Sequence, residues 1–220
     1  MGSSVHWVVQ SHPSRRELRE RLLAGLPADT EVVETDFDPP NPWLGYKLCL
    51  KAIIDSGCSH GVLIQDDCVV PRNLPPAVNK VIQVEPNVPV CLYLGMLPPQ
   101  KGLALRAAKE GKKFVELHQS SFLPVVAVLW PTQKASEFLT WAGEPNLLRR
   151  RNGQFIEERS DDAMGGRWMR TTRQRVLATI PSLVEHPDDA PSTIARRPGG
   201  RTALFWHGVE WDAASVEWFP

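Results

Sequence analysis

The chain has 220 residues, 42% of them hydrophobic, which is enough for one domain with a substantial core. Its 25 Lys and Arg residues balance 25 Asp and Glu residues, so no overall charge attracts it to nucleic acid or to an anionic membrane. The four cysteines have neither CxxC nor zinc spacing, and no apolar run approaches the roughly 20 residues that span a bilayer. We therefore expect a cytoplasmic protein with reduced thiols and no membrane partner.

The first half of the chain alternates strand and helix patterns. Residues 5–9 (VHWVV) predict a strand, and RRELRERLLAGL predicts a helix with Ser14 as its N-cap. A short strand at 31–33 and a stiff proline-containing loop precede a helix at 43–55, where apolar residues recur at helical spacing. A buried strand follows from residue 61. This order predicts an α/β fold whose parallel strands are joined by crossover helices.

The second half continues with shorter elements. We expect a helix at 75–84, a strand at 88–94, a surface loop or hairpin at 97–113, and strands at 114–117 and 124–130. A helix over TQKASEFLTWA, a basic loop at 149–153, a helix from 160 capped by Ser160 and a strand at 176–180 complete the pattern. The predicted organisation is one domain, residues 1–195, with an Arg/Gly- and Trp-rich C-terminal extension, residues 196–220.

Two adjacent acids interrupt the apolar stretch GVLIQDDCVVP. Asp66 and Asp67 follow an all-apolar run that is typical of a buried strand, and ligands bind at the carboxyl ends of such strands. Carboxylates there suit Mg²⁺ or Mn²⁺, which bridge protein oxygens to substrate phosphates. Because neighbouring strand residues point to opposite faces, the two acids are expected to have different roles. The structural alternative is a simple turn after the strand.

A second acid pair and a histidine occur further along the chain. Asp161 and Asp162 begin a predicted helix, where acids stabilise the helix dipole without any other role, although one of them could act as a general base. His186 follows a strand-like SLVE and is either structural or a metal ligand. Arg15, after the first strand, could reach a diphosphate, and RRPGGR is a candidate phosphate loop.

Three motifs occur in a characteristic order: SHGVLIQDD, SDDAMGGRW and PSLVEHPDDAPS. This ordered set resembles small GT-A-fold glycosyltransferases, particularly those encoded by bacteriophages, and more distantly the lipopolysaccharide and collagen sugar-transferase group. The resemblance covers residues 5–195 and also includes NPWLGYKLCLKAI. It implies a GT-A, Rossmann-like fold with a mixed, mainly parallel sheet flanked by helices.

The resemblance also implies a site. Its first motif corresponds to a DxD-type metal and nucleotide site in which Gln65 replaces the first acid, so that Asp67 becomes the metal ligand and Asp66 a ribose contact. His186 would complete the metal shell, and Asp161 or Asp162 would be the base of an inverting enzyme. The implied nucleotide-sugar contacts are Ser11, Arg15, Gln65 and Asp66.

The function implied by the resemblance is transfer of a sugar, with UDP as the expected nucleotide, to an acceptor hydroxyl with Mn²⁺ or Mg²⁺ as cofactor. A hydroxymethylated base in phage DNA is one candidate acceptor. Two alternatives remain open at this point. The same acid pairs fit another Mg²⁺-dependent enzyme acting on phosphates, such as a nucleotidyltransferase or phosphohydrolase. The Arg-rich 149–175 region and the Trp-rich tail fit a non-catalytic nucleic-acid-binding or protein-binding module.

Overall fold

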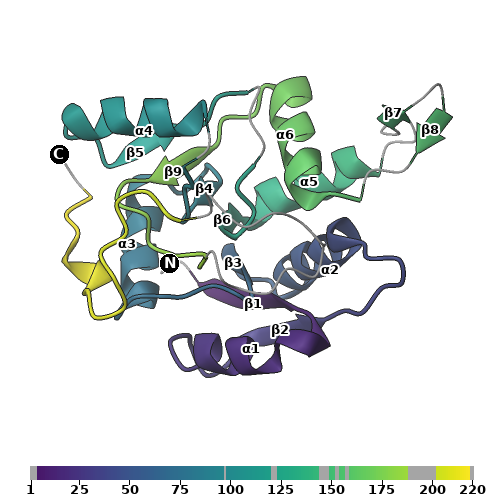
Figure 1. The fold of residues 1–220 in the computed structure, drawn as a ribbon, viewed down its shortest axis with the longest axis horizontal. Coiled ribbons are helices and arrows are strands. Elements are labelled where there is room, and N and C mark those ends of the chain that lie inside the picture. Colours follow the sequence, from purple (N-terminus) through teal and green to yellow (C-terminus); the bar gives the residue numbers. More distant parts are fainter. Residues whose placement is uncertain are drawn as a thin grey trace.

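A seven-stranded mixed sheet, in the order β2-β1-β3-β6-β4-β9-β5, forms the centre of the molecule (Figure 1). The structure is a computed structural model that describes residues 4–96, 98–119, 123–143, 149–151, 154–156, 159–187 and 202–218. The strands of the sheet are β1 (Val5–Ser11), β2 (Glu31–Glu34), β3 (His60–Gln65), β4 (Val90–Cys91), β5 (Phe114–Glu116), β6 (Ala127–Pro131) and β9 (Leu177–Thr179). The helices are α1 (Arg16–Leu23), α2 (Pro42–Asp55), α3 (Leu74–Val84), α4 (Gln100–Lys109), α5 (Thr132–Ala142) and α6 (Asp161–Thr172), with short 3₁₀ turns η1 (Pro13–Arg15) and η2 (Ala213–Ser215).

The strand pairings confirm the predicted mixed α/β sheet. Strand β1 is parallel to β2 and to β3, and β4 is parallel to β9. Strand β6 lies antiparallel between β3 and β4, and β5 is antiparallel to β9. The parallel β2-β1-β3 group therefore brings the carboxyl ends of its three strands to one edge of the sheet.

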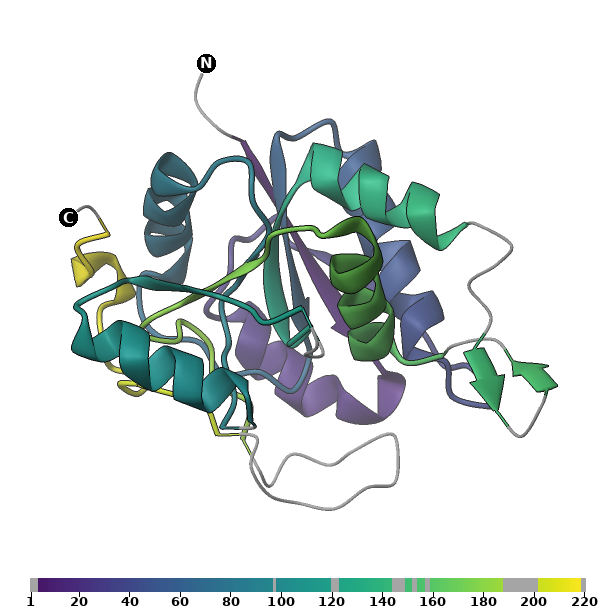
Figure 2. The ribbon, with the colours of Figure 1, turned by 90° about the horizontal axis from the view of Figure 1, so that it is seen from above.

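Both faces of the sheet are covered, which explains the uninterrupted apolar run of β3. Along this strand Leu63 belongs to the core under α2, α4, α5 and α6, whereas Val62 and Ile64 belong to the core under α1 and α3. Figure 2 shows α2, α5 and α6 grouped on one side, with α3 on the other. All three of these β3 side chains are fully buried.

The described part of the C-terminal extension, residues 202–218, packs on this same core. The backbone N–H of Leu204 donates to Leu94 O at 2.8 Å, and the 3₁₀ turn η2 lies against α3. Ala213 and Trp218 are buried in the core that includes α3. The division at residues 195/196 stays a prediction, but residues 202–218 contribute to the core of the sheet domain.

Several local predictions were wrong. Residues 100–109 form α4 where a loop or hairpin was expected, because alanines favour a helix and two of them, Ala104 and Ala107, are buried. Helix α1 begins at Arg16, so Ser14 is not its N-cap; Ser14 lies in η1, where its N–H donates to the His12 ring. Only Val90–Cys91 of the 88–94 run is a strand. Residues 149–151 form a strand, β7, paired with β8 (Gln154–Ile156), instead of a basic loop.

Candidate functional site

The candidate site lies where the carboxyl ends of β1 and β3 meet. The chain leaves β1 toward β2 on one side and later returns to form β3 on the other side of β1. Loops that leave neighbouring parallel strands in opposite directions create the position at which open α/β sheets bind ligands. Ser11 is the last residue of β1, the loop after it carries His12 and Arg15, and the turn after β3 carries Asp66 and Asp67.

Asp66 joins the two strand ends. Its backbone N–H donates to Gln10 O, so the β1–β3 pairing extends one residue past the strand. Its side-chain Oδ2 accepts a 2.7 Å hydrogen bond from the backbone N–H of His12, and its Oδ1 lies 3.0 Å from Arg15 Nη1. The carboxylate of Asp66 therefore fixes the conformation of the loop after β1.

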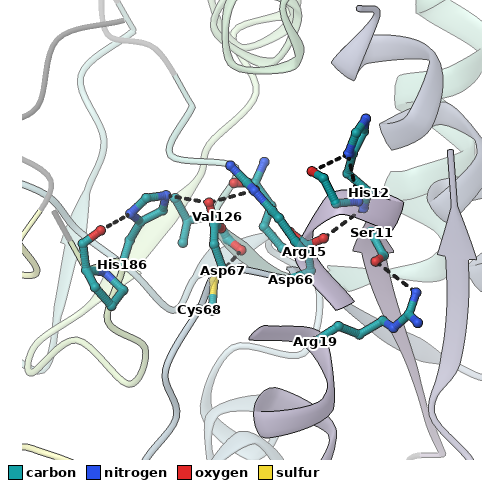
Figure 3. Close-up of polar contacts among 12 residues, drawn as sticks. Ser11, His12, Arg15, Arg19, Asp66, Asp67, Cys68, Val126 and His186 are labelled. Atoms are coloured by element: carbon teal, nitrogen blue, oxygen red, sulfur yellow. Dashed lines mark hydrogen bonds and ion pairs between the residues drawn. The ribbon is translucent and has the colours of Figure 1, made fainter. Parts of the chain in front are cut away.

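Asp67 contacts His186, which comes from a distant part of the sequence. His186 Nε2 lies 3.2 Å from Asp67 Oδ2, and both side chains are buried (Figure 3). Two backbone hydrogen bonds between Val69 and Glu185, each 2.9 Å long, hold the two segments together. The fold thus brings Asp67 and His186 into direct contact, and their role as metal ligands stays a prediction.

The other ring nitrogen of His186 completes its orientation. Nδ1 lies 3.2 Å from the backbone oxygen of Pro187, which can only accept a hydrogen bond. Both ring nitrogens therefore face oxygen acceptors, Nδ1 the Pro187 carbonyl and Nε2 the Asp67 carboxylate, and a metal held by Nε2 would replace the Nε2–Asp67 contact while Nδ1 still donates to the carbonyl. Metal-ligating histidines in proteins are oriented in this way, with the second nitrogen donating to a carbonyl or carboxylate.

Arg15 lies between the two acids. One guanidinium nitrogen, Nη1, is 3.0 Å from Asp66 Oδ1 and 2.7 Å from Asp67 Oδ2, and only 10% of the Arg15 side chain is exposed. Figure 3 shows a row that runs from His186 through Asp67 and Arg15 to Asp66 and His12. The positive charge of Arg15 compensates two carboxylates that would otherwise be costly to bury.

The two adjacent acids have opposite pKa shifts. Desolvation raises the pKa of Asp66 above its usual value, although the His12 N–H and Arg15 act against it. Desolvation also acts to raise the pKa of Asp67, but the His186 hydrogen bond and charge, together with Arg15, hold it below its usual value. Asp67 is therefore the better anionic ligand of the pair.

The chemistry of the donor set fits a cation that is shared with a substrate. Asp67 Oδ1 is buried and has no hydrogen-bond partner among the described residues, so one carboxylate oxygen is left for a ligand. Asp67 and His186 could hold Mn²⁺ or Mg²⁺, with phosphate oxygens and water in the remaining positions. In the described ranges no three His, Cys, Asp or Glu side chains form a metal-binding group. The described residues therefore do not form a site in which the protein alone supplies all the metal ligands.

Asp161 approaches the same strand end from the opposite face of the sheet. It is the first residue of α6, it is 7% exposed, and its Oδ2 accepts a long 3.4 Å hydrogen bond from Gln65 Nε2. Burial, with a smaller contribution from the charge of Asp162, raises the pKa of Asp161 to about 7. A carboxyl with this pKa can exchange a proton at neutral pH.

Asp162 is placed differently from its neighbour. Its carboxylate accepts a hydrogen bond from the Ser160 hydroxyl and one of 2.7 Å from the backbone N–H of Ala163. Both contacts lie within the first turn of α6, where an acid stabilises the helix. The structure therefore separates the predicted acid pair into Asp162, an acid in the first turn of α6, and Asp161, which faces the strand end.

The remaining predicted nucleotide contacts lie on two faces of the sheet. Ser11 is buried, and its hydroxyl accepts a 3.3 Å hydrogen bond from Arg19 Nη1 on α1, away from the Asp67–His186 contact. Gln65 points toward Asp161, beside Gln10 of β1 in the strand register. The phosphate-loop candidate RRPGGR at 196–201 lies outside the described residues.

Sequence reasoning did not single out Glu185. Its Oε1 accepts hydrogen bonds of 2.8 Å from the backbone N–H groups of His186 and Ala203, so this buried carboxylate ties the histidine segment to the C-terminal segment. The available signal was a charged residue directly before His186 in an otherwise apolar SLV run. Its partner Ala203, 18 residues along the chain, had no such signal.

Comparison with known proteins finds only distant likenesses, and these are to solved structures. No family model matches the chain, and no curated protein matches it. A crystal structure of A197 from STIV superposes with a TM-score of 0.48 at 13% sequence identity and covers 83% of each chain. A likeness of this size carries no argument about activity. No described helix is long and apolar enough to cross a membrane.

Proposed function

We propose that this protein is a cation-dependent glycosyltransferase of the GT-A type, which transfers a sugar from a nucleotide-diphosphate sugar to an acceptor hydroxyl. One observation carries the proposal. Asp67 and His186, which are far apart in the sequence, are in contact 3.2 Å apart at the carboxyl end of β3, next to the strand residue that contacts Asp161. Two ligand-type side chains and a carboxyl with a pKa of about 7 thus belong to one strand end.

The leaving group is stabilised at the Asp67 side of this strand end. When bound there, a divalent cation supplies positive charge to the departing diphosphate. Asp67 and His186 would hold the cation, and Arg15 adds a second positive charge from the loop after β1. Asp66 holds that loop in place through the His12 N–H, so the guanidinium is oriented before substrate arrives.

The acceptor is activated at the Asp161 side. The acceptor oxygen forms a bond to the anomeric carbon while the bond from that carbon to the diphosphate oxygen breaks. The proton of the acceptor hydroxyl passes to the Asp161 carboxylate. A base with a pKa of about 7 combines a useful ionised fraction at neutral pH with a favourable proton affinity. A base opposite the leaving group corresponds to inversion at the anomeric carbon.

Ligand-induced thermal stabilisation tests this proposal. UDP, GDP, CDP, ADP and TDP and their sugar derivatives are added with Mn²⁺, with Mg²⁺ and with a chelator. At about 100 times its dissociation constant, the true nucleotide stabilises the fold by about 2.7 kcal/mol, which raises the melting temperature of a domain this size by about 5–10 °C. We expect UDP with Mn²⁺ to give this shift. Asp67→Asn and His186→Ala should each remove the metal-dependent part.

The same panel decides between reaction types. Product analysis of each stabilising nucleotide sugar separates sugar transfer from simple release of phosphate or pyrophosphate. The acceptor screen contains small hydroxyl compounds and matched DNA with and without hydroxymethylated bases. Absence of any metal-dependent nucleotide effect would refute the proposal, and phosphate release without transfer would replace it with a phosphohydrolase or nucleotidyltransferase. Transfer to hydroxymethylated DNA alone would identify the acceptor.

A further inference from the structure

Arg15 occupies the carboxylate that a metal ion would use. Its Nη1 is 2.7 Å from Asp67 Oδ2, closer than His186 Nε2 at 3.2 Å, and the same nitrogen also contacts Asp66. The side chains of both acids are only 2% exposed, so water does little to screen these charges. Arg15 is therefore a built-in cation of this acid pair.

We infer that Arg15 makes metal binding at this site depend on the nucleotide. This inference rests on the proposed function and concerns the order in which its ligands bind. Two carboxylates and one guanidinium leave at most one net negative charge at the acid pair, where the His186 ring also contacts Asp67. A divalent cation alone would reverse this to a net positive charge in a buried position, which is unfavourable. A nucleoside diphosphate brings enough negative charge to compensate both Arg15 and the metal.

The consequence is positive cooperativity between metal and nucleotide. The negative charge of the diphosphate compensates the positive charge of the metal, and the reverse also holds. Each ligand therefore raises the affinity for the other by the same factor. Arg15 plays opposite parts in the two binding events: it repels the metal and attracts the diphosphate. Replacing Arg15 should therefore strengthen metal binding and weaken diphosphate binding. Replacing a residue that only stabilises the fold would weaken both.

Neutral and charged replacements of Arg15 separate these parts. In Arg15→Gln the repulsion disappears, so we expect Mn²⁺ alone to bind about ten-fold more tightly or better than to the wild type. The gain in Mn²⁺ affinity on adding UDP should shrink by about the same factor, since the diphosphate has lost its guanidinium contact. Arg15→Lys keeps the charge without the planar fork and should retain most of the dependence on UDP.

Titration of the full-length protein with Mn²⁺, followed by calorimetry or by the electron paramagnetic resonance signal of free Mn²⁺, measures these effects with and without UDP. Arg16→Gln is the matched control, because Arg16 is the neighbouring residue and pairs with exposed Glu20 instead. It should bind Mn²⁺ as the wild type does. Circular dichroism establishes that each variant is folded.

The possible outcomes are distinct. Equal Mn²⁺ affinities of wild type, Arg15→Gln and Arg16→Gln would overturn the inference, as would a wild type that binds Mn²⁺ equally well with and without UDP. The second comparison decides the matter if Arg15→Gln does not fold. Absence of sugar transfer with the cooperativity intact would refute only the proposed function, whereas transfer with equal Mn²⁺ affinities would refute only the role of Arg15.

Discussion

Asp161→Asn should make the folded protein more stable and should abolish the proposed sugar transfer. Asp161 is only 7% exposed, and its Oδ2 accepts a 3.4 Å hydrogen bond from the Gln65 side chain. The replacement keeps the shape of the side chain and cannot ionise. Rotation of the Gln65 amide lets its oxygen accept from the new amide group. The backbone N–H of Asp162, which now donates to Asp161 Oδ1 at 2.9 Å, keeps an oxygen acceptor.

The magnitude follows from the pKa. Burial raises the pKa of Asp161 from 3.8 to about 7, so the folded state holds this proton more tightly than the unfolded state does. Stability is therefore lost as pH rises from about 4 to about 7, and the ionised carboxylate costs the folded state about 4 kcal/mol above that range. Asp161→Asn avoids this penalty. Near pH 8 it should be more stable than the wild type by up to about 4 kcal/mol, and near pH 4 the difference should vanish.

Urea unfolding of both proteins at several pH values between about 4 and 8 measures this difference. Turnover in the same buffers should rise with pH through about 7 in the wild type and fall by about 100-fold or more in Asp161→Asn, because the proposed general base is lost. Asp162→Asn is the control with the opposite sign: it removes a negative charge from the first turn of α6 and should lower stability by about 0.3–1 kcal/mol. A stability difference between wild type and Asp161→Asn that does not change with pH would refute the pKa argument. Full turnover would refute the role as base.

Four further variants, two at Glu185 and two at glycines, test how the fold is held together. Glu185→Ala leaves the buried N–H groups of His186 and Ala203 without their acceptor, so the free energy of unfolding should fall by about 3 kcal/mol and Mn²⁺ affinity should weaken. Glu185→Gln, whose side-chain carbonyl still accepts, should lose less stability. Equal stability of the wild type and both variants in urea unfolding would contradict this prediction. Gly165→Ala places a Cβ 2.5 Å from Leu123 Cδ2 and should lower the free energy of unfolding by about 1–3 kcal/mol. Gly102→Ala in α4 meets no atom within 4 Å and should raise it by about 0.5–1 kcal/mol. Melting temperatures of the two variants that move in the same direction would refute the packing argument.

Elements with a strong local pattern were predicted well. The apolar periodicity of α2 and the unbroken run of β3 were sufficient to place both, and the acids after β3 pointed to its carboxyl end. Helix α4 was missed because Gly102 and several lysines obscured a helix whose buried face consists mainly of alanines. Alanine contributes little to an apolar pattern, although it favours a helix more than any other residue.

The contacts of the site could not be read in the same way. Asp67 was the expected metal ligand, but nothing near it in the sequence showed that Arg15 would contact both acids or that Glu185 would fasten His186 to Ala203. These contacts join segments that lie far apart in the chain. Their assignment needs the strand order β2-β1-β3, which brings the loops after β1 and β3 together.

The amino-acid sequence by itself determined the α/β character of the chain and the position of two acids after a buried strand, because periodicity and strand ends are written in windows of a few residues. Only the tertiary structure decided which charges meet and how strongly water is excluded from them. In the folded chain Asp67 contacts His186 and Arg15, and burial raises the pKa of Asp161 to about 7. Protonation and metal affinity depend on desolvation and on neighbouring charges, and both are properties of the assembled fold.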